Sequence, residues 1–259
     1  MEELIITLVT AFVVFGILAH LTPCNKNQPL IRAGMVTDLL FRFVNMSSRF
    51  VTQAFLTIGF GVLFYKTPPE QLIQYIGNGY GYLGSLPLWV QAATVFILSD
   101  ILLYWAHRFF HTPTLWKWHA IHHSSKVVDW LSTHRFHPVN VWLSFTVVDS
   151  LMILIGFSPK SIAVMGLFNT MYSYMVHANL NWTFGKFRYL FASPVFHRWH
   201  HSIQKEAQNK NFAPTFPLLD IMFGTFYMPE GKLPERYGVY GMDIPESFIG
   251  QLIFPFKQP

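Results

Sequence analysis

Histidine is the residue type in this chain whose spacing indicates chemistry. Twelve histidines are present, and only His20 lies outside residues 107–201. His107 and His111 form an HxxxH pair, and residues four apart share one face of a helix. The pattern HxxHH occurs twice, and in each copy three rings share a helix face. The members of these two triplets are His119, His122, His123, His197, His200 and His201.

Imidazoles gathered in this way indicate a metal site. Eight nitrogen donors exceed the four that one tetrahedral zinc ion takes, so the pattern favours two ions. Imidazole binds iron, zinc, copper and nickel, and ligand type alone does not choose among these metals. Ionisable groups held near hydrocarbon are functional by default, whereas a lone histidine such as His20 is better explained as packing at an interface.

Several other kinds of site do not fit the sequence. The soluble di-iron bundles use Glu-x-x-His pairs, and this chain has none. A zinc protease needs HExxH, and no histidine pair here carries that glutamate. A bis-histidine haem needs two facing histidines inside a bilayer rather than triplets at its edge. Nucleic-acid binding is not expected, because the net charge of +5 comes without a basic run.

The elements that must position these histidines are predicted to be membrane helices. The chain is 52% hydrophobic and 12% charged, whereas a typical soluble domain is about 25% charged. Residues 4–21 and 86–106 have the length and apolarity of spanning helices. Residues 50–65 are uncharged and bracketed by Arg49 and Lys66, whose long side chains can extend to the interface. We expect the first segment to stay as an anchor, since its start is acidic.

A helical hairpin is expected between the two halves of the histidine set. Residues 139–157 and 162–176 are apolar and are joined by Ser158-Pro159-Lys160, which is too short for anything but an antiparallel connection. The second arm is short, so the hairpin either crosses the bilayer or re-enters it.

The distribution of basic residues predicts which side the histidines face. The loop after the first span carries Lys26, Arg32, Arg42 and Arg49, and the positive-inside rule places it in the cytoplasm. The next two spans then deliver residue 106 and the following histidines to the cytoplasmic surface. Under this topology only Lys66 and Lys160 of the 18 Lys and Arg residues fall outside.

Both HxxHH motifs are preceded by residues that start helices. Thr112 is placed as the N-cap and Pro113 as the first helical residue before HAIHH, and Ser193 and Pro194 have the same places before HRWHH. The fold class predicted is therefore all-α: an integral membrane helical bundle with a cytoplasmic, histidine-rich helical cap.

The motifs HRFFH, HAIHH and HRWHH, in this order beside membrane spans, resemble the fatty acid hydroxylase and sterol desaturase superfamily of integral-membrane di-iron oxygenases. The resemblance covers roughly residues 100–226. It extends to LWKWHAIHHSS, to RFHP at residues 135–138, and to NKNFAPTFPLLDIMFGTF at residues 209–226.

The resemblance implies a set of metal ligands. His177, in YMVHANLNW, lies where the family often has another histidine, and it is expected to join the eight of the three motifs. His134 and His137 match positions where members vary, so ligation, a supporting role and plain packing stay open for them. The resulting ligand set is His107, His111, His119, His122, His123, His177, His197, His200 and His201.

Acidic residues near these ligands are expected to orient the imidazoles, because neutral ligands leave the charge of bound metal uncompensated. Asp100 lies seven residues before His107, on the same helix face, and Asp220 is a second candidate. Two positions depart from the family pattern. Thr112 stands where the alkylglycerol mono-oxygenase branch usually has Glu, which argues against that activity, and Leu219 stands where many members have Trp.

The function implied is a membrane-bound oxidoreductase, a non-haem di-iron mono-oxygenase of the sterol desaturase kind. It would hydroxylate or desaturate an aliphatic C–H bond of a lipid with dioxygen, and zinc could occupy the site on purification. The chain has no flavin or nicotinamide fingerprint and one cysteine, Cys24. An external reductase with a ferredoxin or b-type cytochrome must therefore supply electrons. The alternative is a zinc-dependent membrane hydrolase or another metal-binding membrane protein without redox chemistry.

Three regions are expected along the chain. Residues 1–97 form N-terminal membrane anchor helices, residues 98–226 form the catalytic domain, and residues 227–259 form a tail rich in Pro and Gly that packs at the interface.

Overall fold

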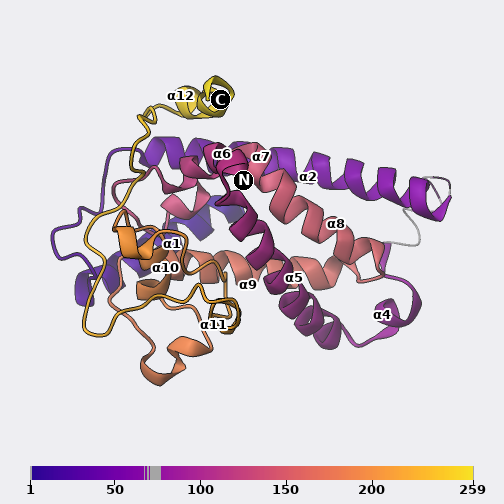
Figure 1. The fold of residues 1–259 in the computed structure, drawn as a ribbon. Helices are drawn as coiled ribbons and strands as arrows, with labels where there is room; N and C mark the ends of the chain where they lie inside the picture. The colour runs from indigo at the N-terminus through magenta and orange to yellow at the C-terminus, as the bar shows by residue number, and fades with distance from the viewer. Residues whose placement is uncertain (1, 67, 69, 71–76, 259) are drawn as a thin grey trace.

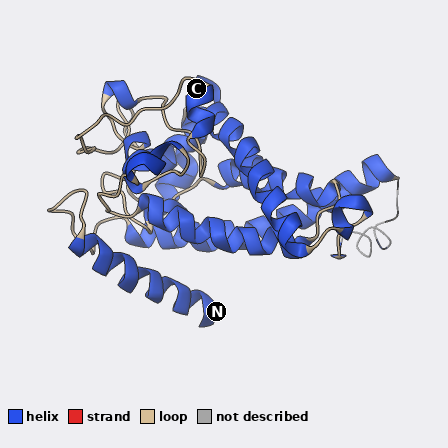
Figure 2. Cartoon of the chain, turned by 90° about the horizontal axis from the view of Figure 1, so that it is seen from below, coloured by secondary structure: helices blue, strands red, loops and turns tan. Residues whose placement is uncertain are grey.

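The structure is a computed structural model that describes residues 2–66, 68, 70 and 77–258. The described part is built of helices and the loops between them, without strands, which confirms the predicted all-α class (Figure 2). Its longer helices are α1 (Glu2–Leu21), α2 (Met35–Tyr65), α5 (Leu88–Phe110), α6 (Pro113–His123), α8 (Val147–Leu154) and α9 (Pro159–His177). Its shorter α-helices are α4 (Gly81–Ser85), α7 (Pro138–Val141), α10 (Pro194–His200), α11 (Leu218–Met222) and α12 (Phe248–Ile253).

Short turns of tighter or wider helix connect these elements. A π-helical turn, η2 (Trp142–Thr146), joins α7 to α8, so the first arm of the predicted hairpin is one continuous helical segment. The remaining turns are η1 (Ser132–His134), η3 (Gly185–Tyr189), η4 (Lys205–Ala207) and η5 (Phe254–Lys257).

The long helices pack side by side as an elongated bundle (Figure 1). α5 packs against α9, and α2 packs against α8. The turn between α8 and α9 is closed by Ser158, whose hydroxyl accepts a hydrogen bond from the backbone N–H of Ser161 at 3.2 Å, while Pro159 is the first residue of α9. The expected antiparallel hairpin is therefore present.

The two helices that carry the HxxHH motifs begin where the sequence predicts. Pro113 opens α6 and Pro194 opens α10. Ser193 caps α10 by accepting a hydrogen bond from the N–H of Phe196 at 3.2 Å. The predicted cap at Thr112 is wrong in its chemistry, because its hydroxyl instead donates to the carbonyl of Phe109, at 2.7 Å. This contact closes the end of α5 rather than the start of α6.

The second helix is much longer than its apolar segment. α2 begins at Met35, so Arg42 and Arg49 are helix residues and not part of a loop as expected. Arg49 pairs with Asp149 of α8, and this ion pair explains how a charged residue is accommodated within the helix packing.

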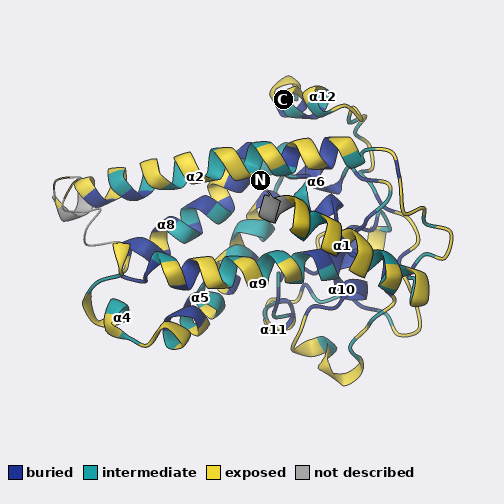
Figure 3. Ribbon diagram, turned by 180° about the vertical axis from the view of Figure 1, so that it is seen from behind, coloured by how far each residue is buried: buried dark blue, intermediate teal, exposed yellow. Residues whose placement is uncertain are grey.

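Among the described helices one, α5, is long and apolar enough to cross a bilayer by length and composition. Two shorter apolar stretches, Ile5–Leu21 and Pro138–Leu154, lie in α1 and along α7 to α8. α1 and α2 display many exposed side chains (Figure 3), including Ile5 at 55% and Phe50 at 79%. By contrast, every residue of α10 is buried. The helix that carries the second HxxHH motif is therefore fully enclosed by the rest of the protein.

Candidate metal centre

Nine histidine side chains come together in two groups. The five-histidine cluster consists of His107, His111, His119, His123 and His200, and the four-histidine cluster consists of His122, His177, His197 and His201. Within each cluster one ring nitrogen per residue lies within 4.8 Å of those of all the others. These nine are the histidines that the sequence predicted as ligands, and each cluster could hold a metal ion.

Four helices bring the clusters together. The end of α5 supplies the HxxxH pair, α6 and α10 supply one HxxHH triplet each, and His177 ends α9. α6 and α10 each give residues to both clusters, because the last two histidines of each triplet point to different neighbours. The clusters adjoin: the ring centroids of His123 and His201, one from each, are 4.5 Å apart.

The Nε2 atoms converge within each cluster. In the five-histidine cluster, Nε2 of His119 lies 3.1 Å from Nε2 of His107 and 3.2 Å from Nε2 of His123. In the four-histidine cluster, Nε2 of His197 lies 3.1 Å from those of His177 and His201. Two nitrogens bound to one ion at about 2.0–2.1 Å are roughly 3 Å apart, so the spacing fits imidazoles around a shared ion.

The other ring nitrogens of His107 and His119 show that the contact between these two residues is not a hydrogen bond. Nδ1 of His107 lies 2.7 Å from the carbonyl of Phe212, which only accepts, so Nδ1 carries the proton and donates. Nδ1 of His119 donates in the same way to Oδ1 of Asn140 at 2.7 Å. In the neutral rings, both Nε2 atoms then bear lone pairs, 3.1 Å apart with no proton between them. Facing lone pairs repel each other unless a cation lies between them.

His111 and His200 also have ring nitrogens that point to a bound cation. Nδ1 of His200 donates to the carbonyl of Lys210 at 2.7 Å, which leaves its Nε2 as an acceptor. Nε2 of His200 and Nε2 of His111 are both buried without a hydrogen-bond partner. Buried polar atoms without partners are costly and call for an explanation, such as an ion.

The electrostatics keep these imidazoles neutral. Burial, reinforced by the neighbouring imidazoles, lowers the pKa of His122, His123 and His201 well below its ordinary value. Burial likewise lowers the pKa of His197 and His200. Because a neutral imidazole is the form that binds a metal, the rings are ready to act as ligands near neutral pH.

The two uncertain histidines lie outside both clusters. Nε2 of His134 is 2.9 Å from the hydroxyl of Tyr174, and Nε2 of His137 is 3.1 Å from the carbonyl of Leu252. Nδ1 of His137 also accepts from the N–H of Val139 at the start of α7. Their contacts are those of packing and capping residues.

The two candidate acids bind backbone N–H groups rather than imidazoles. Asp220 accepts from the N–H groups of Phe212 and Ala213, at 2.8 and 2.9 Å, and Asp100 accepts from that of Phe216 at 3.2 Å. Asp220 therefore holds the segment that contacts the imidazoles, and Asp100 holds the chain just beyond that segment.

The groups that contact the Nδ1 atoms were missed by the sequence reasoning. Asn140 lies two residues after the RFHP motif, and its position close behind a histidine motif is the only signal that pointed to it. The carbonyls of Lys210, Phe212 and Ser173 complete the set, with Ser173 accepting from His177 at 2.8 Å. Backbone carbonyls occur at every residue, so no sequence pattern identifies them.

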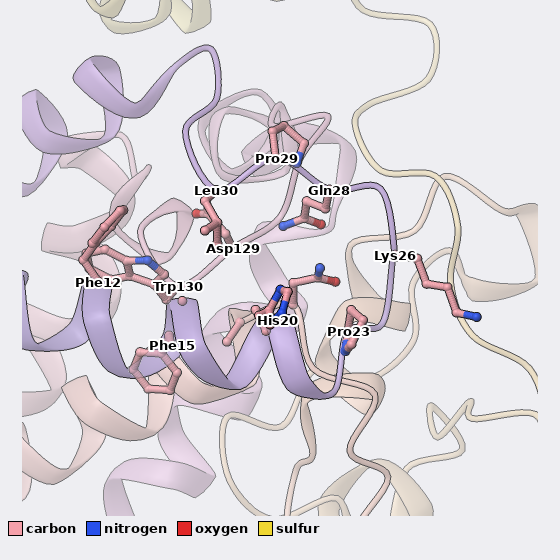
Figure 4. Close-up of a pocket in the computed structure, with 14 residues that line it drawn as sticks. Phe12, Phe15, His20, Pro23, Lys26, Gln28, Pro29, Leu30, Asp129 and Trp130 are labelled. Atoms are coloured by element: carbon pink, nitrogen blue, oxygen red, sulfur yellow. The ribbon is translucent and has the colours of Figure 1, made fainter.

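A separate pocket of about 120 Å³ lies beside the end of α1 (Figure 4). Phe12, Phe15 and Trp130 line one side of it, and His20 and Asn179 also contribute. None of the nine clustered histidines lines this pocket, so it is distinct from the candidate metal centre.

Comparisons with known proteins identify relatives that act on lipids. The chain is 27% identical over 173 residues to the ornithine lipid hydroxylase OlsE of Rhizobium tropici, a match that covers 66% of this chain and 52% of the relative. It is 31% identical over 175 residues to the alkylglycerol monooxygenase of Danio rerio, covering 66% of this chain and 37% of the relative. The human alkylglycerol monooxygenase is 28% identical over 189 residues, covering 71% and 40%.

These matches limit what can be carried over. The chain spans between about a third and a half of the length of these relatives. Alkylglycerol monooxygenases are among the relatives although Thr112 departs from the pattern of that branch. The departure at this one position therefore does not exclude sequence similarity to that branch. No solved structure matches the chain.

The family comparison covers the whole histidine region. The model of the fatty acid hydroxylase family matches residues 92–225, which is more than half of the chain and includes all nine clustered histidines. The chain therefore belongs to the fatty acid hydroxylase family.

Proposed function

We propose that this protein is a membrane-bound di-iron mono-oxygenase that hydroxylates an aliphatic C–H bond of a lipid. The observation that carries the proposal is the convergence of nine buried or half-buried imidazoles in two adjoining clusters, with the Nε2 lone pairs of His107 and His119 facing each other. The nine clustered histidines are the proposed ligands, five for one ion and four for the other.

The donor set supports redox metal chemistry. Two iron ions bound here would supply the activation of dioxygen that oxidation of an unactivated C–H bond requires. The protein's part is to hold nine neutral imidazoles in place and to exclude water. It does so by burial, since His119, His122, His123, His200 and His201 are each at most 4% exposed. Zinc is another metal that these ligands would accept on purification.

The substrate class follows from the relatives and the surface. The relatives are named for ornithine lipid and for alkylglycerol, both amphiphilic lipids. The exposed apolar side chains of α1 and α2 suit contact with acyl chains rather than water. We infer a multi-pass membrane protein with residues 98–226 as its catalytic domain and the histidine clusters on the cytoplasmic side, where a lipid enters laterally.

Electrons come from a partner under this proposal. The sequence contains no flavin or nicotinamide fingerprint and a single cysteine, so an external reductase with a ferredoxin or b-type cytochrome is required. Desaturation at the same carbon is the alternative outcome. The position of the substrate carbon decides between hydroxylation and desaturation.

The experiment that tests the proposal is comparative lipid mass spectrometry of cells that express the chain or its His200→Ala variant. We expect a lipid that gains one oxygen atom, or loses two hydrogens for desaturation, in cells with the parent chain alone. Identical lipid profiles in the two strains, with both proteins present in the membrane at equal levels, would contradict the proposal.

A zinc-dependent hydrolase is the second candidate, because imidazole binds zinc well. The two differ in their co-substrates, since a hydrolase works without dioxygen and without a reductant. Product formation by membranes under anaerobic, reductant-free conditions would favour the hydrolase over the mono-oxygenase.

A further inference from the structure

We propose that the 209–212 loop is a positioning element for the five-histidine cluster alone, and that Asp220 is the positioning residue that holds it. This inference rests on the proposed metal centre and assigns a separate support to one of its two ions.

The loop contacts two of the five histidines of that cluster. The carbonyl of Phe212 accepts from Nδ1 of His107, and the carbonyl of Lys210 accepts from Nδ1 of His200, both at 2.7 Å. In the four-histidine cluster, Nδ1 of His177 instead donates to a carbonyl of its own helix, that of Ser173.

The backbone of the loop is shaped for these contacts. Asn209 and Asn211 have φ of 56° and 59°, in the left-handed region. Asparagine tolerates this region better than most residues, because its short polar side chain bonds locally. The two left-handed residues flank Lys210, and the carbonyls that contact the cluster belong to the alternate residues Lys210 and Phe212. The conformation of the loop therefore decides where two acceptors point.

Buried polar groups hold the loop in this shape. Asn211 is fully buried, and its amide donates to the carbonyls of Phe196 at 2.9 Å and Tyr227 at 2.7 Å. Phe196 belongs to α10, so the loop is bonded to the helix whose histidine it orients.

Asp220 fixes the other end of the loop. Its carboxylate is fully buried, and it accepts hydrogen bonds from the N–H groups of Phe212 and Ala213 and from the hydroxyl of Thr225 at 2.6 Å. The peptide group that follows Phe212 thus donates its N–H to Asp220 and offers its carbonyl to His107. A carboxylate in this place acts on the metal ligand through one peptide group, as carboxylates behind ligating histidines do directly.

The test is a Co²⁺ titration of the purified chain in detergent micelles after removal of bound metal, followed by visible absorption. The parent chain is expected to bind two ions. His200→Ala and His177→Ala identify which absorption band belongs to the five-histidine and which to the four-histidine cluster. Asp220→Asn should lower the Co²⁺ affinity of the site whose band is missing in His200→Ala by about ten- to a hundredfold. The affinity of the other site should stay unchanged.

Two further variants separate positioning from folding. Asn209→Ala changes an exposed side chain, so the fold is kept, but it disfavours the left-handed backbone that directs the loop, so the same band should weaken. Asp243→Asn makes the same chemical change as Asp220→Asn at an exposed carboxylate and should alter neither band. Equal weakening of both bands, or of the four-histidine band alone, in both Asp220→Asn and Asn209→Ala would overturn the inference. A parent chain that binds no Co²⁺ through these histidines would overturn the proposed metal centre itself.

Discussion

In the proposed metal centre each imidazole presents one ring nitrogen to a metal, and the hydrogen bond made by the other ring nitrogen determines which of the two carries the lone pair. His107, His119, His177 and His200 donate from Nδ1 to oxygen acceptors at 2.7–2.8 Å. His122 lacks such an acceptor, and its ring instead stacks on Phe136 at 3.9 Å between centroids and 10° between planes. Hydrogen bonds orient part of the ligand set, and ring packing orients at least one other member.

Membership of the clusters is testable one histidine at a time. His134→Ala and His137→Ala are expected to keep two metal ions per chain, because both rings are bonded elsewhere. His119→Ala should lose at least one ion, because its Nε2 lies within 3.2 Å of two other Nε2 atoms. Elemental analysis of the purified protein measures the metal content of each variant. Loss of metal in His134→Ala would show that the ligands include more than the nine clustered histidines.

Asn140 should be required for the orientation of His119. Asn140→Leu removes the acceptor for Nδ1, so we expect metal affinity to fall by about ten- to a hundredfold. Asn140→Asp keeps an acceptor oxygen in place and should restore most of that loss. Equilibrium metal competition with a chelator measures both, and equal affinities for Asn140→Leu and the parent would exclude the role.

The members of the two histidine clusters could be predicted from the sequence, because side-chain type and helical spacing define most of them. His177 had no triplet around it and was predicted from the family resemblance alone. The acceptors behind the ligands were not predictable, since two of them are the carbonyls of Lys210 and Phe212, and their direction depends on left-handed backbone at Asn209 and Asn211. Sequence patterns carry side-chain chemistry, whereas these acceptors come from conformation.

At the scale of elements, a buried ionic network joins α2 to the loop that follows α6. Arg32 forms two hydrogen bonds of 2.7 Å to the carboxylate of Asp129 and one of 2.6 Å to Asp38 of α2. Arg135 pairs with the same Asp38. Arg32 and Arg135 thus share Asp38, which is fully buried. The network fixes α2 against the segment between α6 and α7.

Loss of the shared aspartate should destabilise the protein strongly. Asp38→Asn leaves the buried Arg135 without its carboxylate partner and Arg32 with Asp129 alone, and breaking a buried pair in this way costs about 3–5 kcal/mol. We expect the thermal unfolding midpoint in detergent to fall well below that of Asp243→Asn, an exposed control. Equal midpoints for the two variants would show that the network does not hold α2.

Element boundaries were predictable where caps and prolines mark them, as at Pro113, Pro159 and Pro194. The start of α2 was not, because Arg42 and Arg49 indicated a cytoplasmic loop by charge alone. Arg49 is placed in the helix by its ion pair with Asp149, more than ninety residues away in sequence. Contacts of this kind override local composition.

At the scale of the whole molecule, the proposal includes the way the helices are placed in the membrane. α5 has the length and apolarity to cross a bilayer, and exposed apolar side chains cover α1 and α2. The proposed topology puts the α8–α9 turn outside the cell and the α6 end inside.

Cysteine labelling on intact cells tests this topology. In a Cys24→Ser background, Lys160→Cys should react with a membrane-impermeant maleimide, and Lys126→Cys should react only after the cells are opened. Both positions are exposed in the structure, so access to them depends on the membrane. Labelling of neither position before lysis would indicate a re-entrant hairpin, and labelling of Lys126→Cys alone would reverse the topology.

The source of the oxygen atom tests the central claim most directly. Membranes containing the chain, a reductant and the native lipids are incubated under isotopically heavy dioxygen in ordinary water, with His200→Ala membranes as the control. We expect a hydroxylated lipid that carries the heavy isotope, formed by the parent chain and not by His200→Ala. A hydroxyl group with oxygen from water, or the same product formed without dioxygen, would contradict it.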